Sequence, residues 1–167
     1  MLTMKAKYAL RALCALVDAH PERLQARQIA TVADVPEKFL EAILVELRKA
    51  GIVASKRGVQ GGHALAKPAE RIMVGDIIRT LDGPIAPIRC ASVTAYRACE
   101  DCPEPESCAL RVLMGDVRDA MSDVVDHRSL QQLVLDASLQ LRAPLGTERS
   151  FAEAFSENGW VGQPYLR

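Results

Sequence analysis

The sequence predicts a mainly α-helical protein, with a winged helix-turn-helix in its first half and a long helix in its second half. Two observations lead to this fold class: apolar residues recur at helical spacing in separate segments, and two short β-prone segments flank a glycine-rich stretch. The chain has 167 residues, of which 49% are hydrophobic. A chain of this size and composition can bury one good core, or a small domain with an appendage.

Three helices are predicted before Gly51. Thr3 can cap the first helix, a short second helix is expected at residues 25–33, and Pro36 fits the first turn of the third. Gly51 stops the third helix, because glycine readily adopts the backbone conformation of a C-terminal cap. The third helix has an apolar stripe, which consists of Phe39, Leu40, Ile43, Leu44 and Leu47.

The residues after Gly51 turn this helical pattern into a more specific motif. Two helices joined by a turn of about three or four residues are a helix-turn-helix, and the next residues predict a β-hairpin. Residues 52–54 and 63–66 are its strands, and residues 57–62 are its glycine-rich tip. A hairpin with a basic tip beside a recognition helix can follow a phosphate backbone and insert an arginine into a groove. We therefore expect residues 1–83 to form a DNA-binding domain whose partner is double-stranded DNA.

The distribution of charge supports this expectation, although the net charge of the chain is zero. Residues 1–71 contain twelve Lys or Arg against seven Asp or Glu, whereas residues 72–167 contain nine against fourteen. Residues 47–69 contain five basic residues and no acidic one. A solvated charged face is the alternative interpretation of such a run, but its location in the hairpin favours contact with nucleic acid.

The second half is predicted to contain a short packing helix at residues 74–81 and two later helices. The longer of these covers residues 109–125, and its apolar residues alternate in steps of three and four, a pattern typical of a dimer contact. This seam consists of Leu113, Val117, Met121 and Val124. Burial of the seam against the chain's own core is the alternative. A last helix at 130–141, capped by Ser129, completes a dimerisation segment at 109–142.

Several classes of protein are not expected. No apolar run reaches the length of a membrane span, and charged residues occupy the start of the chain, where a signal peptide needs an apolar stretch, so a cytoplasmic protein is expected. The three histidines lie apart without a neighbouring nucleophile, and no phosphate-binding glycine loop is present, so neither an enzyme nor a small-molecule substrate is expected. Residues 143–167 are expected to be a flexible tail.

Four of the five cysteines lie within the stretch CASVTAYRACEDCPEPESC, which begins at Cys90 and ends at Cys108. Cytosolic thiols are kept reduced, so metal binding or redox sensing is favoured over a structural disulfide. Thiolates are soft ligands for iron-sulfur clusters and for tetrahedral zinc. Zinc sites usually contain two close cysteine pairs, whereas only Cys99 and Cys102 form one here, and a metal-free thiol switch is a further alternative. Cys14 belongs to the first helix and is expected to be a small buried hydrophobe.

Four stretches of the sequence occur together in an order that is specific to one family. They are KAKYALRAL, PEKFLEAILVELRKAGIVASKRGVQGGHALAKP, VGDIIRTLDG and CPEPESCALRVLMGDVRDAM, within residues 3–135. Together they resemble the Rrf-type bacterial winged-helix transcriptional regulators, the family of the IscR, NsrR and CymR type. The resemblance implies a homodimer, joined through the long helix, that binds a pseudo-palindromic operator and represses transcription. Many members hold an iron-sulfur cluster in the cysteine loop and change their DNA affinity with the state of that cluster, whereas others lack the cysteines.

Roles in DNA binding carry over only where positions match. By resemblance, Lys38 and Glu41 at the start of the recognition helix are candidates for base contacts, and Arg57 at the wing tip for a groove contact. The alternatives are an ordinary surface lysine for Lys38 and an ion pair with a neighbouring lysine for Glu41. The remaining candidates lie in the basic run and the wing: Arg48, Lys56, Gln60 and Lys67.

The cysteine loop, residues 84–108, both matches the family and departs from it. Cys102 and Cys108 match the last two ligands of the family's cluster, and Cys90 matches the first. Cys99 is additional. The resemblance therefore places an iron-sulfur cluster of the 2Fe-2S or 4Fe-4S type in this loop, one per subunit, with zinc as a lesser alternative. An iron-sulfur carrier would share the loop, but it has no use for a basic wing.

The fourth ligand of related clusters comes from positions that hold cations in this chain. Some members use a histidine three residues after the last cysteine, where this sequence has Arg111. Others use a side chain of the partner's first helix, and the matching positions here are Lys7 and Arg11. These cations are not expected to ligate a metal, so Cys99 is the best candidate for the fourth ligand. The predicted function is a transcriptional repressor that acts as a redox sensor through its cluster.

Overall fold

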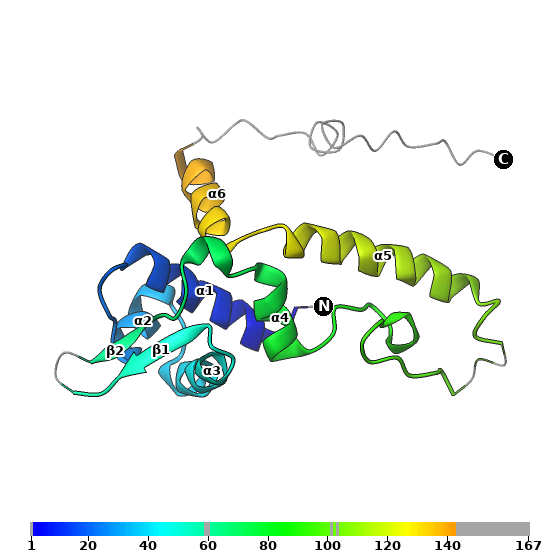
Figure 1. Cartoon of the computed structure of the whole chain (residues 1–167), viewed down its shortest axis with the longest axis horizontal. Helices are drawn as coiled ribbons and strands as arrows, with labels where there is room; N and C mark the ends of the chain where they lie inside the picture. Colours follow the sequence, from blue (N-terminus) through cyan, green and yellow to red (C-terminus); the bar gives the residue numbers. More distant parts are fainter. Residues whose placement is uncertain (1, 59–60, 101, 103, 143–167) are drawn as a thin grey trace. The chain divides into compact units, whose positions relative to one another are not determined.

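The computed structural model describes residues 2–58, 61–100, 102 and 104–142, and it confirms a mainly helical fold with a small sheet (Figure 1). Gln60 and the predicted tail lie outside the described residues. The elements in chain order are α1 (Met4–Asp18), α2 (Ala26–Ala33), α3 (Glu37–Lys49), β1 (Val53–Lys56), β2 (Gly62–Leu65), the 3-10 turn η1 (Ala69–Arg71), α4 (Val74–Asp82), the 3-10 turn η2 (Arg89–Ala91), α5 (Ala109–Asp126) and α6 (Leu130–Arg142).

The chain divides into two compact units, residues 1–135 and 136–167. The predicted boundaries after residues 83, 108 and 142 stay predictions. In the described part of the chain, no helix combines the length and the apolar character that crossing a bilayer requires.

Helix α1 is central to the first unit, since it contacts α2, α3, α4 and β2. Four buried alanines recur along it at every third position, and small side chains let neighbouring helices approach closely. As predicted, Thr3 caps this helix, because its hydroxyl oxygen accepts a hydrogen bond from the backbone N–H of Ala6 at 3.2 Å. The backbone N–H of Thr3 also donates to Asp82 at 2.9 Å, which connects the start of α1 to the end of α4.

Helix α3 buries four of the five residues of its predicted stripe, and the fifth is a correction. Phe39 lies in the first turn of α3, where its ring stacks on that of Tyr8 with centroids 6.5 Å apart and stays 51% exposed. Pro36 precedes the first helical residue and acts as the N-cap. At the other end Gly51 has a φ of 69°, and the N–H of Ile52 bonds to the carbonyl of Leu47 at 2.9 Å, a Schellman arrangement that confirms the predicted stop.

The predicted wing is present as an antiparallel pair of strands, with Val53 opposite Leu65 and Lys56 opposite Gly62. A third segment extends it, because Leu24 and His63 exchange two backbone hydrogen bonds of 3.0 and 2.7 Å. Gly62 has a φ of 140°, and a Cβ there would meet the carbonyl of Leu24. Glycine at this position therefore lets the hairpin pack against the segment that leads into α2.

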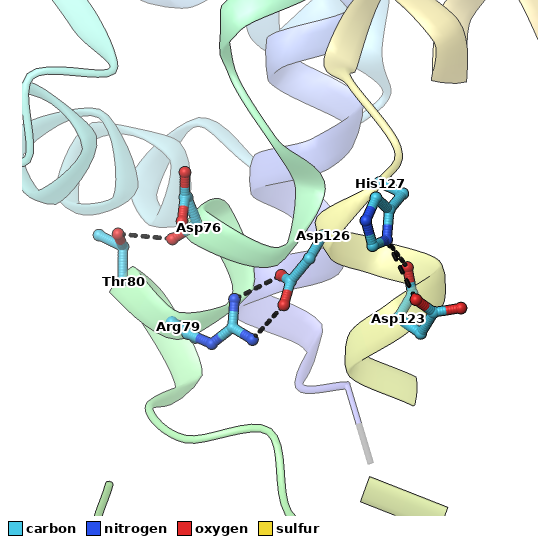
Figure 2. A network of polar contacts seen from close by, with 6 residues as sticks. All are labelled: Asp76, Arg79, Thr80, Asp123, Asp126 and His127. Atoms are coloured by element: carbon cyan, nitrogen blue, oxygen red, sulfur yellow. Dashed lines mark hydrogen bonds and ion pairs between the residues drawn. The ribbon is translucent and has the colours of Figure 1, made fainter. Parts of the chain in front are cut away.

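The end of α5 is fastened to α4 by an ion pair and by backbone hydrogen bonds. The guanidinium of Arg79 donates to both carboxylate oxygens of Asp126, at 2.6 and 2.7 Å (Figure 2). Nearby, the N–H of Val74 donates to the carbonyl of Arg128 at 2.9 Å, and Leu130, which is fully buried, donates from its N–H to Ile72. These contacts hold the α5–α6 connection against the winged part.

The ion pair also makes this junction sensitive to acid. Hydrogen bonding from Arg79 lowers the pKa of the Asp126 carboxyl. A carboxyl whose pKa is lower in the folded state stabilises the fold at pH values above its unfolded pKa. That contribution is lost as the pH falls through the lowered value. Both side chains are more than a third exposed, so the contribution is screened by solvent.

Gly75 is a sharp test of this junction, because a Cβ at that position would collide with the carboxylate of Asp126 and crowd Arg79. The atoms that this Cβ would meet are the ends of the Asp126 and Arg79 side chains, so their ion pair has to shift or break. We expect Gly75→Ala to be about 1–2 kcal/mol less stable in urea unfolding than the matched variant Gly115→Ala, which adds a methyl group where no atom lies within 4 Å. Equal unfolding free energies for the two variants would show that the junction yields without cost.

Candidate nucleic-acid interface and cysteine loop

One face of α3 carries the predicted base-reading residues. Lys38, Glu41, Val45 and Arg48 follow one another at helical spacing, and all four are exposed. The ammonium of Lys38 lies 4.9 Å from the centroid of the Phe39 ring, so the half-exposed aromatic residue also lies at this end of the helix. Glu41 makes no ion pair among the described residues, so the alternative interpretation of a helix-stabilising pair finds no support.

A hollow of about 270 Å³ extends this face toward the wing. It is lined by Ala26, Glu41, Leu44, Val45, Arg48, Ser55 and His63. The fold thus brings α2, α3 and both strands together around the predicted residues Glu41 and Arg48. His63 was not predicted to be part of this site. Burial lowers the pKa of its imidazole, and the charges of Arg48 and Arg23 lower it further. Its Nδ1 is buried and has no hydrogen-bond partner among the described residues.

The predicted cations of the wing are exposed and free of ion pairs in the described part of the chain. Lys56 ends β1, and Arg57 follows it directly at the hairpin tip. Lys67 lies after the hairpin. Together with Ala50, at the C-terminal end of α3, it lines a second hollow of about 390 Å³. By contrast, Lys5 and Arg11 on α1 are paired with Glu46 and Asp34, at 3.1 and 3.0 Å. Unpaired cations keep their charge available for phosphate.

The four thiols of the cysteine loop differ in exposure, and two of them interact. Cys90 is buried on η2, Cys102 and Cys108 are partly buried, and Cys99 is exposed. Desolvation raises the pKa of the Cys102 thiol, and its interactions with Cys108 and Cys90 raise it further. The backbone N–H of Arg111 at the start of α5 is the largest cause that lowers the pKa of the Cys108 thiol. Cys102 and Cys108 thus form an interacting pair.

Neighbouring thiols do not by themselves form a finished metal site. Among the described residues, no three His, Cys, Asp or Glu side chains stand where they could hold one metal ion together. The donor set of four soft thiolates fits an iron-sulfur cluster chemically. Within this set, Cys102 and Cys108 are the two thiols that interact directly. Cys14 is separate, since it packs against the core, where burial raises the pKa of its thiol to about 11. A thiol of that pKa stays protonated, as expected for an inert hydrophobe.

Two arginines of α5 contact the loop in a way that the sequence did not indicate. Arg111 donates to the backbone carbonyls of Cys90 at 3.2 Å and Pro105 at 3.1 Å, and Arg118 donates to Ala91 at 2.6 Å. The guanidinium of Arg111 also lies 5.3 Å from the centroid of the Tyr96 ring. The spacing of the arginines by two helical turns was visible, but their partners lie up to 27 residues away.

The apolar seam of α5 is exposed in the single chain. No residue of α5 is buried, and the exposed fractions of Leu113, Val117, Met121 and Val124 are 54, 38, 42 and 62%. The chain's own core therefore does not cover this seam, contrary to the alternative interpretation. Contiguous exposed apolar side chains on one helix are typical of a protein interface.

A recognition helix, a wing and exposed cations beside them define a winged helix-turn-helix protein of the DNA-binding class. The comparisons with known proteins agree. The model of the Rrf2 family, described as an iron-dependent transcriptional regulator, matches residues 2–136. The chain belongs to the Rrf2 family of transcriptional regulators, whose members bind DNA and are not enzymes.

Individual relatives cover most of the chain. A protein of Rhodobacter capsulatus named as an rrf2-like HTH-type transcriptional regulator is 40% identical over 138 residues, which are 80% of this chain and 92% of the relative. The structure of CymR, the global cysteine regulator of B. subtilis, is similar with a TM-score of 0.67 and 34% identity, covering 81% of this chain and 97% of CymR. The structure of T. potens IscR has the same TM-score at 27% identity, covering 86% and 92%.

Proposed function

We propose that the protein is a homodimeric, cytoplasmic repressor whose affinity for its operator responds to an iron-sulfur cluster held by the cysteine loop. The observation that carries this proposal is the interacting pair of Cys102 and Cys108 just before α5, together with the hydrogen bond that Arg111 of α5 donates to the carbonyl of Cys90. The other end of α5 is fastened to the winged part through Asp126. A change in the loop can therefore reach the DNA-binding face through one helix.

The DNA-binding half of the proposal rests on the exposed face of α3 and the wing. Two copies joined through the α5 seam would present two recognition helices, as a pseudo-palindromic operator requires. Lys38 and Glu41 would meet base edges, Glu41 by accepting from cytosine, while Arg57 would enter a neighbouring groove. Arg48 and Lys56 would meet phosphates, as would Lys67 if the DNA reaches the base of the wing.

The metal half of the proposal assigns four ligands. Cys90, Cys99, Cys102 and Cys108 would hold one cluster per subunit, and such a cluster supplies reversible electron gain or loss and sensitivity to oxidants. Cys99 is the exposed member of this set. A second candidate is favoured by the interacting Cys102–Cys108 pair, which could form a disulfide on oxidation and act as a metal-free thiol switch. Zinc on the same four thiolates is a lesser alternative.

The DNA-binding assignment predicts different effects for two cations. Arg57→Ala should cost about 1–3 kcal/mol of specific operator binding, because a groove contact is lost. Lys67→Ala should chiefly reduce the slope of log affinity against log salt, by about one, because only a phosphate contact is lost. Gel shifts with operator and random DNA over a salt series measure both quantities. Unchanged operator affinity in Arg57→Ala would remove the wing tip from the interface.

The assembly assignment predicts that the seam holds the dimer. Val117→Asp should give monomers that bind the operator weakly, because a charge is placed in an apolar contact and each half-site then binds alone. Val112→Asp is the matched control, since Val112 is an exposed valine of the same helix that lies outside the seam. Sedimentation velocity reports the mass of each variant. A dimer that survives Val117→Asp would place the interface on another surface.

The cluster assignment predicts the same loss for four single replacements. Serine at position 90, 99, 102 or 108 should lower the iron and sulfide content of protein purified without oxygen and alter its operator affinity, because one soft ligand is removed. Cys14→Ser is the control and should leave both unchanged. A full and stable cluster in Cys99→Ser would refute the all-cysteine site. Wild-type protein without iron and sulfide, but with an oxidant-dependent gel shift, would favour the thiol switch.

A further inference from the structure

The cysteine loop is attached to α5 through two side chains that are not thiols. Arg111 and Arg118 are seven residues apart, so they lie two turns apart on one side of the helix. Both direct their guanidinium groups at backbone carbonyls of η2, those of Cys90 and Ala91. Arg118 is well covered there, with 20% of its side chain exposed.

Arg111 reaches more than one part of the loop. Its Nε donates to the carbonyl of Cys90, and its Nη1 donates to the carbonyl of Pro105, which lies between Cys102 and Cys108. One rigid guanidinium thus fixes the segment of the first thiol relative to the segment of the last two. The ring of Tyr96 lies against the same guanidinium.

We propose that Arg111 and Arg118 are positioning residues that assemble the cysteine site on α5 before any metal or oxidant reaches it. This inference rests on the proposed function of the loop as a sensor. The two residues neither ligate nor react. They hold the Cys90 segment and the 102–108 segment at the start of α5.

Arg111 and Arg118, with the backbone carbonyls that they bind, are called the clamp. The clamp also determines which element moves when the loop changes its conformation. A rearrangement that moves η2 must break the bonds of Arg111 and Arg118 or drag α5 with it. The arginines occupy a different side of α5 from the seam residues Leu113 and Val117. Met121, the third seam residue, follows Arg118 by three residues, so the sensor side and the proposed dimer contact adjoin at that turn of the helix.

The clamp can be tested on metal-free, reduced protein of full length. Each thiol is alkylated with iodoacetamide, and its rate is read from the corresponding peptide by mass spectrometry. In wild-type protein the buried Cys90 should react more slowly than the exposed Cys99. Arg111→Gln and Arg118→Gln should each accelerate Cys90 by about tenfold or more, because they remove hydrogen bonds from a charged donor.

Three controls separate the clamp from other effects. Arg97→Gln changes an exposed arginine of the same loop whose side chain makes no hydrogen bond or ion pair within the described residues, and it should leave the Cys90 rate unchanged. Arg111→Lys keeps the charge but not the two-carbonyl geometry, so it should behave like Arg111→Gln. Cys14 reports global unfolding, because it packs against the core and should stay slow in every variant.

The outcomes test the clamp and the cluster proposal independently of each other. Unchanged Cys90 rates in both glutamine variants, or full protection in Arg111→Lys, would overturn the clamp. If Arg111→Gln accelerates Cys14 as well, that variant has unfolded and the Arg118→Gln rates decide alone. After anaerobic reconstitution, loss of the clamp should weaken iron retention against a chelator by about 10- to 100-fold. If wild-type protein takes up no iron, the cluster proposal fails, while the alkylation rates still test the clamp.

Discussion

The bidentate contact between Arg79 and Asp126 is the constraint on which the rest of the arrangement depends. It joins α4, which packs on the central helix of the winged part, to the last turn of α5. Because Gly75 has no side chain, the carboxylate can approach the backbone of α4 closely, and the adjacent backbone bridge between Met73 and Ser129 adds two more hydrogen bonds. Without this junction, the direction in which α5 leaves the winged part would have no fixed reference.

Helix α5 combines three functions because its residues face different directions. Its last turn is held to α4, one side binds the cysteine loop through Arg111 and Arg118, and the apolar seam is left exposed. An 18-residue helix has five turns, which is enough for these contacts to lie apart along its length and around its axis. Its lack of buried residues follows from this position, since it is bounded by the loop and the proposed partner and not by the core.

The chemistry of the loop depends on which thiols join the interacting pair of Cys102 and Cys108. A pair of interacting thiols can serve either a cluster or a disulfide, and the third and fourth decide between them. Cys90 is held by its own backbone carbonyl, whereas Cys99 is exposed in the same loop. The proposed sensing event therefore depends on the conformation of a short segment, and the arginine contacts set the positions from which that segment moves.

The sequence by itself determined the elements whose signals are local. Helical spacing predicted α1, α3 and α5, the glycine at position 51 predicted the end of α3, and the glycine-rich tip predicted the wing. These features depend on neighbours within about four residues, which a sequence displays directly. The family relationship was likewise visible in the order of the motifs.

Only the tertiary structure decided which distant groups meet. Two contacts join segments that lie far apart in the sequence: the pairing of Leu24 with His63 and the bond from Arg111 to the carbonyl of Cys90. The exposure of Phe39 likewise did not follow from the apolar periodicity of α3. Arg79 and Asp126 are 47 residues apart, and each alone is an ordinary surface charge. Their contact exists because backbone hydrogen bonds join residues 72–74 to residues 128–130 and bring the start of α4 beside the end of α5, a pairing that no local pattern encodes.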